Sequence, residues 1–217
     1  MASAFFGRTS LAIVLRGVLR DRSEGRLIRT AVAIKSWVAQ TPSVEEVRPA
    51  RCAGCGAASR PVGGRLVVHG QGLLQRQVRG VLEVDGAPGV AVVAVRRYEC
   101  QKCGAVMTVV PAGMLVRRQY SASSIALALY LWLVLGLSDR QVRRRICAWQ
   151  VQGRSARGWA QLYRWSRSAA SLFGLPRATG SSDAAVRVLS TLRALAPVAL
   201  AAAPIAVQIF EGAACTR

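Results

Sequence analysis

Two short segments decide the fold class of this chain: Cys52-Ala-Gly-Cys55-Gly56 and Cys100-Gln-Lys-Cys103-Gly104. Each segment, here called a knuckle, carries two thiols separated by two residues and followed by a glycine. That spacing lets both sulfur atoms of a knuckle reach one ion, and four thiolates in a tetrahedral array are the preferred ligands of structural Zn²⁺. The glycine permits a tight turn whose backbone amides can donate to sulfur. We therefore expect one zinc ion, bound by Cys52, Cys55, Cys100 and Cys103.

A redox site and a chance occurrence are the other interpretations of these cysteine pairs. A thioredoxin-like site needs one pair that opens a helix within a β-α-β pattern, and the sequence lacks that pattern. Because all four ligands come from the protein, the zinc would have no open coordination position and would be structural. It would substitute for a core that a small β unit cannot build alone.

Three further side chains could bind metal but are not expected to do so. Cys147 and Cys215 are far from the knuckles in sequence, and we expect a buried helix thiol and a terminal free thiol. His69 is the single histidine and stands at the end of an expected strand. A hydrogen-bonded or surface histidine is favoured there over a fifth ligand.

Residues 51–112 are predicted to form a small β unit, a zinc ribbon. Its expected strands are residues 65–69, 75–84, 90–98 and 106–110, with a turn at Gly86-Ala-Pro-Gly89. Residues 56–99 separate Cys55 from Cys100, which makes 44 residues and exceeds the usual ribbon spacing. The extra length fits a β-hairpin inserted between the two halves of the ribbon.

Residues 119–170 are predicted to form a trihelical, helix-turn-helix-like domain. The expected helices are residues 121–135, 139–149 and 156–170, with Ser121, Ser138 and Ser155 as N-caps. Gly136 lies in the turn between the first two helices, as is common in such motifs. The first helix is apolar all round and is expected to be the buried scaffold. Together with the β unit, this domain predicts an α+β fold.

The two flanking regions are expected to carry less structure. Residues 1–50 form an Arg-rich, partly helical leader, with helix-like apolar spacing at residues 11–20 and 27–38. Residues 171–217 are expected to be a linker, a short helix at residues 183–195 and a loose Ala/Pro-rich tail.

Composition favours a binding protein over an enzyme. The 217 residues include 30 Lys+Arg and 10 Asp+Glu, a formal net charge of +20. Few carboxylates and one histidine leave little material for acid–base or carboxylate–metal catalysis, so we expect no catalytic residues. Only Lys35 and Lys102 are lysines, and the arginine excess is typical of a GC-rich genome. A surface this positive still attracts phosphate, and nucleic acid is the usual partner of such a chain.

The arginines of the helical domain and of its junction with the β unit are the candidate contacts to double-stranded DNA. They are Arg96, Arg97, Arg117, Arg118, Arg140, Arg143, Arg144, Arg154, Arg157 and Arg164. Phosphate contacts would give salt-dependent affinity, and arginine on guanine would give any specificity. Either the helix after the turn, residues 139–149, or the third helix, around residues 157–165, could read the DNA. The alternative is a three-helix core with a solvated arginine face.

The sequence predicts no membrane segment and no signal peptide. The longest apolar run, residues 125–137, is about 13 residues long, whereas roughly 20 are needed to span a bilayer. Arginines follow the start of the chain closely, which is unlike an export signal. We therefore expect a cytoplasmic, nucleoid-associated protein with reduced thiols and no membrane partner.

Several motifs resemble the zinc-ribbon heads of bacterial insertion-sequence transposases. The motifs are Arg96-Arg97-Tyr98-Glu99-Cys100-Gln101-Lys102-Cys103-Gly104, Thr108-Val-Val-Pro111, Arg117-Arg118-Gln119-Tyr120-Ser121 and Gly136-Leu137-Ser138-Asp139-Arg140-Gln141-Val142. Residues 37–165, about 130 of the 217 residues, are also similar in layout to short transposase-related proteins from GC-rich bacteria. The resemblance implies metal ligands at the four knuckle cysteines and a DNA-binding helical region. The acidic catalytic core of full transposases has no counterpart here, because only Asp183 and Glu211 are acidic after residue 170.

These observations predict a zinc-dependent, transposase-related DNA-binding protein without a catalytic core. It would act as an accessory protein, a regulator or a truncated remnant. One alternative is a zinc-ribbon adaptor that binds protein, with the arginines solvated. Others are the DNA-binding subunit of a split transposase, partnered by a catalytic subunit, and a decayed fragment.

Overall fold

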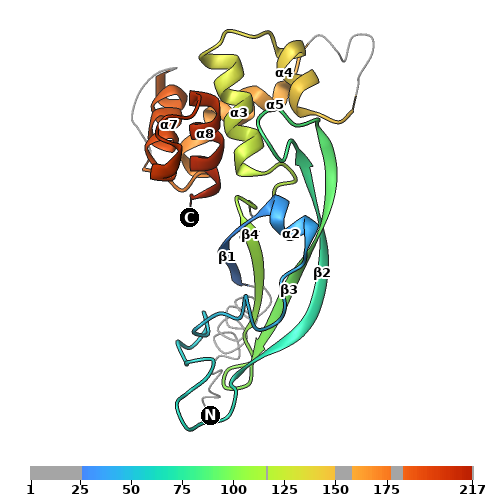
Figure 1. Cartoon of the computed structure of the whole chain (residues 1–217), viewed down its shortest axis with the longest axis vertical. Helices are drawn as coiled ribbons and strands as arrows, with labels where there is room; N and C mark the ends of the chain where they lie inside the picture. Colours follow the sequence, from blue (N-terminus) through green and yellow to red (C-terminus); the bar gives the residue numbers. More distant parts are fainter. Residues whose placement is uncertain (1–25, 116, 150–157, 177–182, 217) are drawn as a thin grey trace, which may run out of the picture. The chain divides into compact units, whose positions relative to one another are not determined.

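The fold is α+β, as expected from the sequence. The computed structural model describes residues 26–115, 117–149, 158–176 and 183–216. Within those ranges it contains one four-stranded sheet and seven α-helices (Figure 1). Two compact units share the chain. Of the described residues, unit 1 holds 26–28, Ser43–Leu74 and Arg96–Val109, and unit 2 holds Arg29–Pro42, Gln75–Val95 and those from Val110 onward.

The sheet has the strand order β1-β4-β3-β2. The strands are β1 (Arg26–Ala33), β2 (Val68–Gly80), β3 (Gly89–Cys100) and β4 (Val106–Ala112). β3 and β4 are antiparallel, with Tyr98 opposite Met107. Both of these side chains are fully buried. The second knuckle connects β3 to β4, so the pairing of these two strands holds its two ends close together.

β2 is longer than the sequence suggested. The two expected strands at residues 65–69 and 75–84 are replaced by the single strand Val68–Gly80, which continues through Gly70 and Gly72. Two glycines within three residues predict an interruption, but Gly72 stays in the strand with a φ of 108°. The expected turn at residues 86–89 falls in the connection between β2 and β3, except that Gly89 is already the first residue of β3.

Residues 27–38 do not form the expected helix, and that prediction is wrong. The segment is strand β1 followed by the short helix α2 (Ile34–Ala39). Strand pairing with β4 overrides the helix-like apolar spacing. Trp37 of α2 is fully buried, and its indole N–H donates to the Ala94 carbonyl at 2.9 Å. The other expected leader helix, residues 11–20, lies outside the described residues.

Helix α3 (Ala122–Leu133) is the centre of unit 2, and every residue from Ala122 to Leu131 is buried. The Ser121 side chain caps it by accepting from the Ser124 N–H at 3.1 Å. Helix α3 packs against four other helices. They are α4 (Asp139–Ile146), α5 (Ala160–Arg167), α7 (Asp183–Ala194) and α8 (Ile205–Ala214). A short helix, α6 (Ala169–Leu172), continues from α5, so the expected third helix is split in two.

The Ala/Pro-rich tail is not loose, which corrects the expectation from its composition. After α7, a 3₁₀ turn (Val198–Leu200) leads to helix α8, which packs against α3 and α7. Ile209, Phe210 and Ala213 of α8 are buried. Gly212 allows this approach, because a Cβ there would collide with the Leu192 carbonyl of α7. Among the alanines that suggested a loose tail, Ala213 is buried, and the other buried contacts of α8 come from its larger side chains and from Gly212.

Candidate metal centre

The two knuckles have the same backbone structure. In the first, the Cys52 N–H donates to the Ala57 carbonyl at 2.8 Å and the Gly56 N–H to the Cys52 carbonyl at 2.9 Å. In the second, the Cys100 N–H donates to the Ala105 carbonyl at 3.0 Å and the Gly104 N–H to the Cys100 carbonyl at 2.7 Å. Gly56 and Gly104 both have positive φ, 71° and 69°, as the tight turn requires.

The knuckles bring four thiols together. The sulfur atoms of Cys52, Cys55, Cys100 and Cys103, here called the cysteine cluster, all lie within 4.8 Å of one another. Two separations between knuckles are 3.7 Å, from Cys52 to Cys103, and 3.8 Å, from Cys55 to Cys100. A tetrahedral ion with metal–sulfur bonds of about 2.3 Å holds its sulfur atoms about 3.8 Å apart. The cluster could therefore hold one metal ion with little rearrangement.

Gly54 is required for a reason that the sequence did not indicate. A Cβ at this position would lie 2.7 Å from the Ala105 Cβ and 3.1 Å from the Cys103 sulfur. The Gly54 N–H also donates to the Cys52 sulfur at 3.1 Å. The absence of a side chain at Gly54 thus lets the second knuckle approach the first closely enough for a shared ion.

The environment of the cluster favours partial ionisation. Burial raises the pKa of Cys52, but the backbone N–H groups of Cys55 and Gly54 and the adjacent thiols outweigh it and lower the pKa to about 7. At Cys103 the Ala105 N–H acts to lower the pKa, but burial and the other three thiols raise it to about 12. The Cys52 thiol therefore ionises readily, whereas ionisation of Cys103 is opposed. A divalent cation would remove that opposition by neutralising the negative charge.

The cluster rests on a small, well-connected core. Met107 is buried behind the first knuckle, and its sulfur accepts from the Ala53 N–H at 3.3 Å. The Gln101 N–H donates to the Val67 carbonyl at 2.8 Å, and the Val67 N–H to the Ser59 carbonyl at 2.9 Å. Cys52 and Cys100 are buried, whereas Cys55 is exposed. One side of the cluster is therefore open to solvent, from which an ion can enter.

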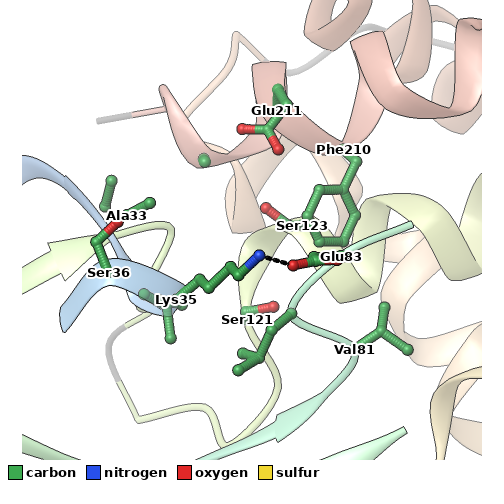
Figure 2. Close-up of a pocket in the computed structure, with 13 residues that line it drawn as sticks. Ala33, Lys35, Ser36, Val81, Glu83, Ser121, Ser123, Phe210 and Glu211 are labelled. Carbon is green, nitrogen blue, oxygen red and sulfur yellow. Dashed lines mark ion pairs between the residues drawn. The ribbon is translucent and has the colours of Figure 1, made fainter. Parts of the chain in front are cut away.

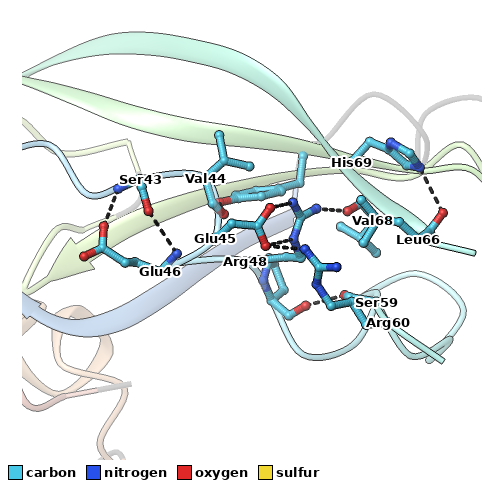
Figure 3. A network of polar contacts seen from close by, with 12 residues as sticks. Ser43, Val44, Glu45, Glu46, Arg48, Ser59, Arg60, Leu66, Val68 and His69 are labelled. Carbon is cyan, nitrogen blue, oxygen red and sulfur yellow. Dashed lines mark hydrogen bonds and ion pairs between the residues drawn. The ribbon is translucent and has the colours of Figure 1, made fainter. Parts of the chain in front are cut away.

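Arg48 connects this core to the chain before the first knuckle, a role that was not predicted from the sequence. Figure 3 shows the Glu45 carboxylate between the guanidinium groups of Arg48 and Arg60. These two partners lower the pKa of Glu45 to about 2. Arg48 is nearly buried, donates to the Val68 carbonyl, and lies 5.8 Å from the Tyr98 ring centroid. This arginine is structural, although it contributes to the basic composition.

Among the described residues, the histidine and the other two cysteines do not belong to the cluster. The His69 ring hydrogen-bonds the Leu66 carbonyl at 2.9 Å and is exposed, and His69 does not belong to the cluster. Cys147 is buried and ends helix α4. Cys215 is exposed at the end of α8.

The candidate DNA-contacting arginines are dispersed. Arg96 and Arg97 are half-buried on β3, and Arg117 and Arg118 are exposed before α3, with Arg117 at a φ of 54°. Arg140, Arg144 and Arg145 are exposed on α4, whereas Arg143 is half-buried. Arg164 is exposed on α5. The other two candidates, Arg154 and Arg157, lie outside the described residues.

Unit 2 contains a pocket of about 340 Å³. In Figure 2, Lys35 of α2 extends to the Glu83 carboxylate, and the Phe210 ring and the Ser123 hydroxyl lie nearby. Burial raises the pKa of the Glu211 carboxyl, which also lines the pocket. Because Lys35 and Glu83 pair with each other, each already has a partner of opposite charge within the pocket.

No family model matches this chain, and no curated protein or solved structure matches it. Among the described residues, no helix is both long and apolar enough to cross a membrane.

Proposed function

We propose that this chain is a zinc-dependent DNA-binding protein, related to transposase heads and without a catalytic core of its own. The cysteine cluster would hold one Zn²⁺ as a structural ion. Zinc is the metal that best matches four thiolates with the observed sulfur separations. When bound, it would cross-link the two knuckles and leave no coordination position open for a substrate.

The observation that carries DNA binding is the arginine surface of α4. Arg140, Arg144 and Arg145 are exposed, and within the described part of the chain no carboxylate forms an ion pair with any of them. Arg140 and Arg144 lie four residues apart and therefore share one face of the helix. A cationic helix face of this kind is suited to phosphate and to guanine edges.

The support under α4 suits a recognition helix. Helix α4 follows α3 after a turn in which Gly136 has a φ of 66°. The Ser138 and Gln141 side chains form a capping box at its start. The Asp139 carboxylate accepts from the Trp159 N–H at 3.3 Å, which ties the start of α5 to the start of α4. These contacts and the packing of α4 and α5 on α3 support a helix-turn-helix arrangement with α4 as the DNA-reading helix.

The test measures zinc content and duplex DNA affinity over a salt series on the same purified protein. We expect one zinc per chain and an affinity that falls steeply with salt. Cys52→Ser should lose the zinc, whereas Cys215→Ser, which removes a thiol outside the cluster, should retain it.

The double variant Arg140→Gln with Arg144→Gln tests the role of α4. Loss of two phosphate contacts should reduce the slope of log affinity against log salt by about 1.8, since each contact contributes about 0.9. The matched control, Arg65→Gln with Arg76→Gln, removes the same charge elsewhere and should change the slope less. Equal slopes in the two double variants would argue against α4 as the helix that contacts DNA. Zinc without DNA binding at low salt would favour the protein-binding adaptor.

A further inference from the structure

Arg79 has an unusual environment near the end of β2. Its backbone N–H donates to the Gln119 carbonyl at 2.7 Å, and it forms a parallel bridge with Tyr120. Its guanidinium carbon lies 4.4 Å from the centroid of the Trp149 ring, just beyond the end of α4. These contacts hold the backbone of Arg79 in place, and Trp149 packs against the charged end of its side chain.

The charge of Arg79 is not compensated within the described part of the chain. Its Nε is buried and has no hydrogen-bond partner there, and no carboxylate forms an ion pair with it. A guanidinium does not lose its proton in a protein, so burial cannot neutralise it as it would a lysine. The guanidinium carbon lies over the Trp149 ring, a cation–π contact that supplies no hydrogen-bond partner to the Nε–H. A buried donor on a charged group without an acceptor is costly, and it calls for an acceptor that the described residues do not supply.

The groups around Arg79 are donors. The positive charges of Arg79 and of Arg143 on α4 both act to lower the pKa of the Tyr120 hydroxyl. The Cys147 thiol is hydrogen-bonded to that hydroxyl. Burial and Cys147 raise the pKa of Tyr120 despite the two arginines, so its hydroxyl stays protonated and adds no negative charge beside Arg79. Two guanidinium groups and a phenol with no carboxylate among them form the donor set that binds tetrahedral oxyanions.

We propose that Arg79, Arg143 and Tyr120 form a binding site for a phosphate group, with Trp149 covering one face of the Arg79 guanidinium. The phosphate could belong to a DNA backbone or be free phosphate. The DNA source rests on the proposed function, whereas the free anion does not. With DNA, the site would add a fixed anchor point at the far end of α4 from the capping box.

The experiment uses the full-length protein and two probes. The first is inorganic phosphate, measured by the thermal shift it causes relative to chloride at equal ionic strength. The second is duplex DNA, measured by affinity at low salt. The variants are Arg79→Gln, which removes the charge, and Arg79→Lys, which keeps the charge but loses the Nε–H and the planar fork. Arg76→Gln is the control, three residues earlier on β2 and therefore on the opposite face of the strand.

We expect both Arg79 variants to bind phosphate, duplex DNA or both about tenfold or more weakly than the wild type. Loss of a hydrogen bond to a charged group has an effect of that size. Arg76→Gln should reduce the same affinity clearly less. If only the affinity for duplex DNA falls, the bound group is a phosphate of the DNA backbone. Phosphate binding that depends on Arg79 without any DNA binding identifies a free anion, which keeps this site and removes the proposed function. If folded Arg79→Lys binds both probes like the wild type, or if phosphate acts no differently from chloride and DNA affinity is unaltered, the site is overturned.

Discussion

At the scale of single residues, the glycines of the knuckles act in two different ways. Gly56 and Gly104 supply positive φ, and a Cβ on either would meet no atom within 4 Å. Gly54 has no such backbone requirement, but a Cβ there would collide with the second knuckle. Substitution at the first two strains one turn, whereas substitution at Gly54 separates the two halves of the metal site.

Gly54→Ala is therefore expected to weaken zinc binding by about tenfold to a hundredfold, the range seen when the supports of metal ligands are altered. The affinity is measured by competition with a chromophoric chelator on reduced protein. Gly89→Ala is the matched control, because a Cβ at Gly89 meets nothing within 4 Å and its φ is not positive. Equal zinc affinities for the two variants would mean that the knuckles can bind the ion without close contact at Gly54.

Glu211 makes stability depend on pH. Burial raises its pKa in the folded protein, so the folded state binds this proton more tightly than the unfolded chain does. The favourable contribution is complete below the unfolded pKa of about 4.3 and is lost as the pH rises through the folded value. At neutral pH the ionised carboxylate therefore disfavours folding.

Glu211→Gln should raise the free energy of unfolding at pH 7 by less than about 1 kcal/mol, because solvent screens a half-exposed carboxylate. At pH 4 the variant and the wild type should be nearly equal. Urea unfolding at a series of pH values measures this difference. A difference that is the same at pH 4 and pH 7 would assign it to packing in the pocket rather than to ionisation.

At the scale of elements, the structures that the sequence predicted are those specified by local patterns. The caps Ser121 and Ser138 start α3 and α4 as expected, and α7 spans nearly the residues predicted for it. Helices α3 and α4 begin at a serine cap, and α3 and α7 have a glycine or a proline, Gly136 and Pro197, shortly after their ends. Such signals act within a few residues and need no knowledge of the rest of the chain.

The elements that were missed depend on contacts between distant residues. Thr30 of β1 donates to the Val110 carbonyl of β4 at 3.3 Å, across a separation of 80 residues. Without that strand, the apolar spacing of residues 27–38 fits a helix equally well. Helix α8 is fixed by packing on α3 and α7, and its alanines alone gave no indication of burial.

The same distinction holds for the candidate sites. The cysteine cluster was predictable, because the residue type and spacing of metal ligands can be recognised in the sequence alone. The Arg48–Glu45–Arg60 network and the stacking of Arg79 on Trp149 were not predictable. In a chain with so many arginines, sequence does not separate structural guanidinium groups from those that bind phosphate.

At the scale of the whole molecule, the two units have cores of very different size. Unit 2 buries much of α3 together with Trp165, Phe173, Leu189 and Leu192. In unit 1 the buried apolar residues are few, and they include Tyr98, Met107 and two of the cysteines themselves. A core that small needs a cross-link, which the metal would supply, whereas the helical core does not.

Removal of the metal should therefore affect the units unequally. We expect a strong chelator, added to reduced full-length protein, to speed backbone amide exchange in residues 52–58 and 100–106 by roughly tenfold or more. Exchange in α3 and α8 should change much less. The five tryptophans all lie in unit 2, so their fluorescence should stay near that of the metal-bound protein.

Hydrogen exchange followed by mass spectrometry distinguishes this outcome from its opposite, because it reports each segment within one intact chain. Strands β2 and β3 have residues in both units, so a disturbance at the knuckles has a covalent and hydrogen-bonded route along the sheet. If α3 lost protection together with the knuckles, the sheet would have transmitted the loss and the two cores would unfold as one. If the knuckles kept their protection after the metal was gone, the hydrogen bonds of the two turns and the burial of Tyr98 and Met107 would be sufficient, and the ion would not be structural.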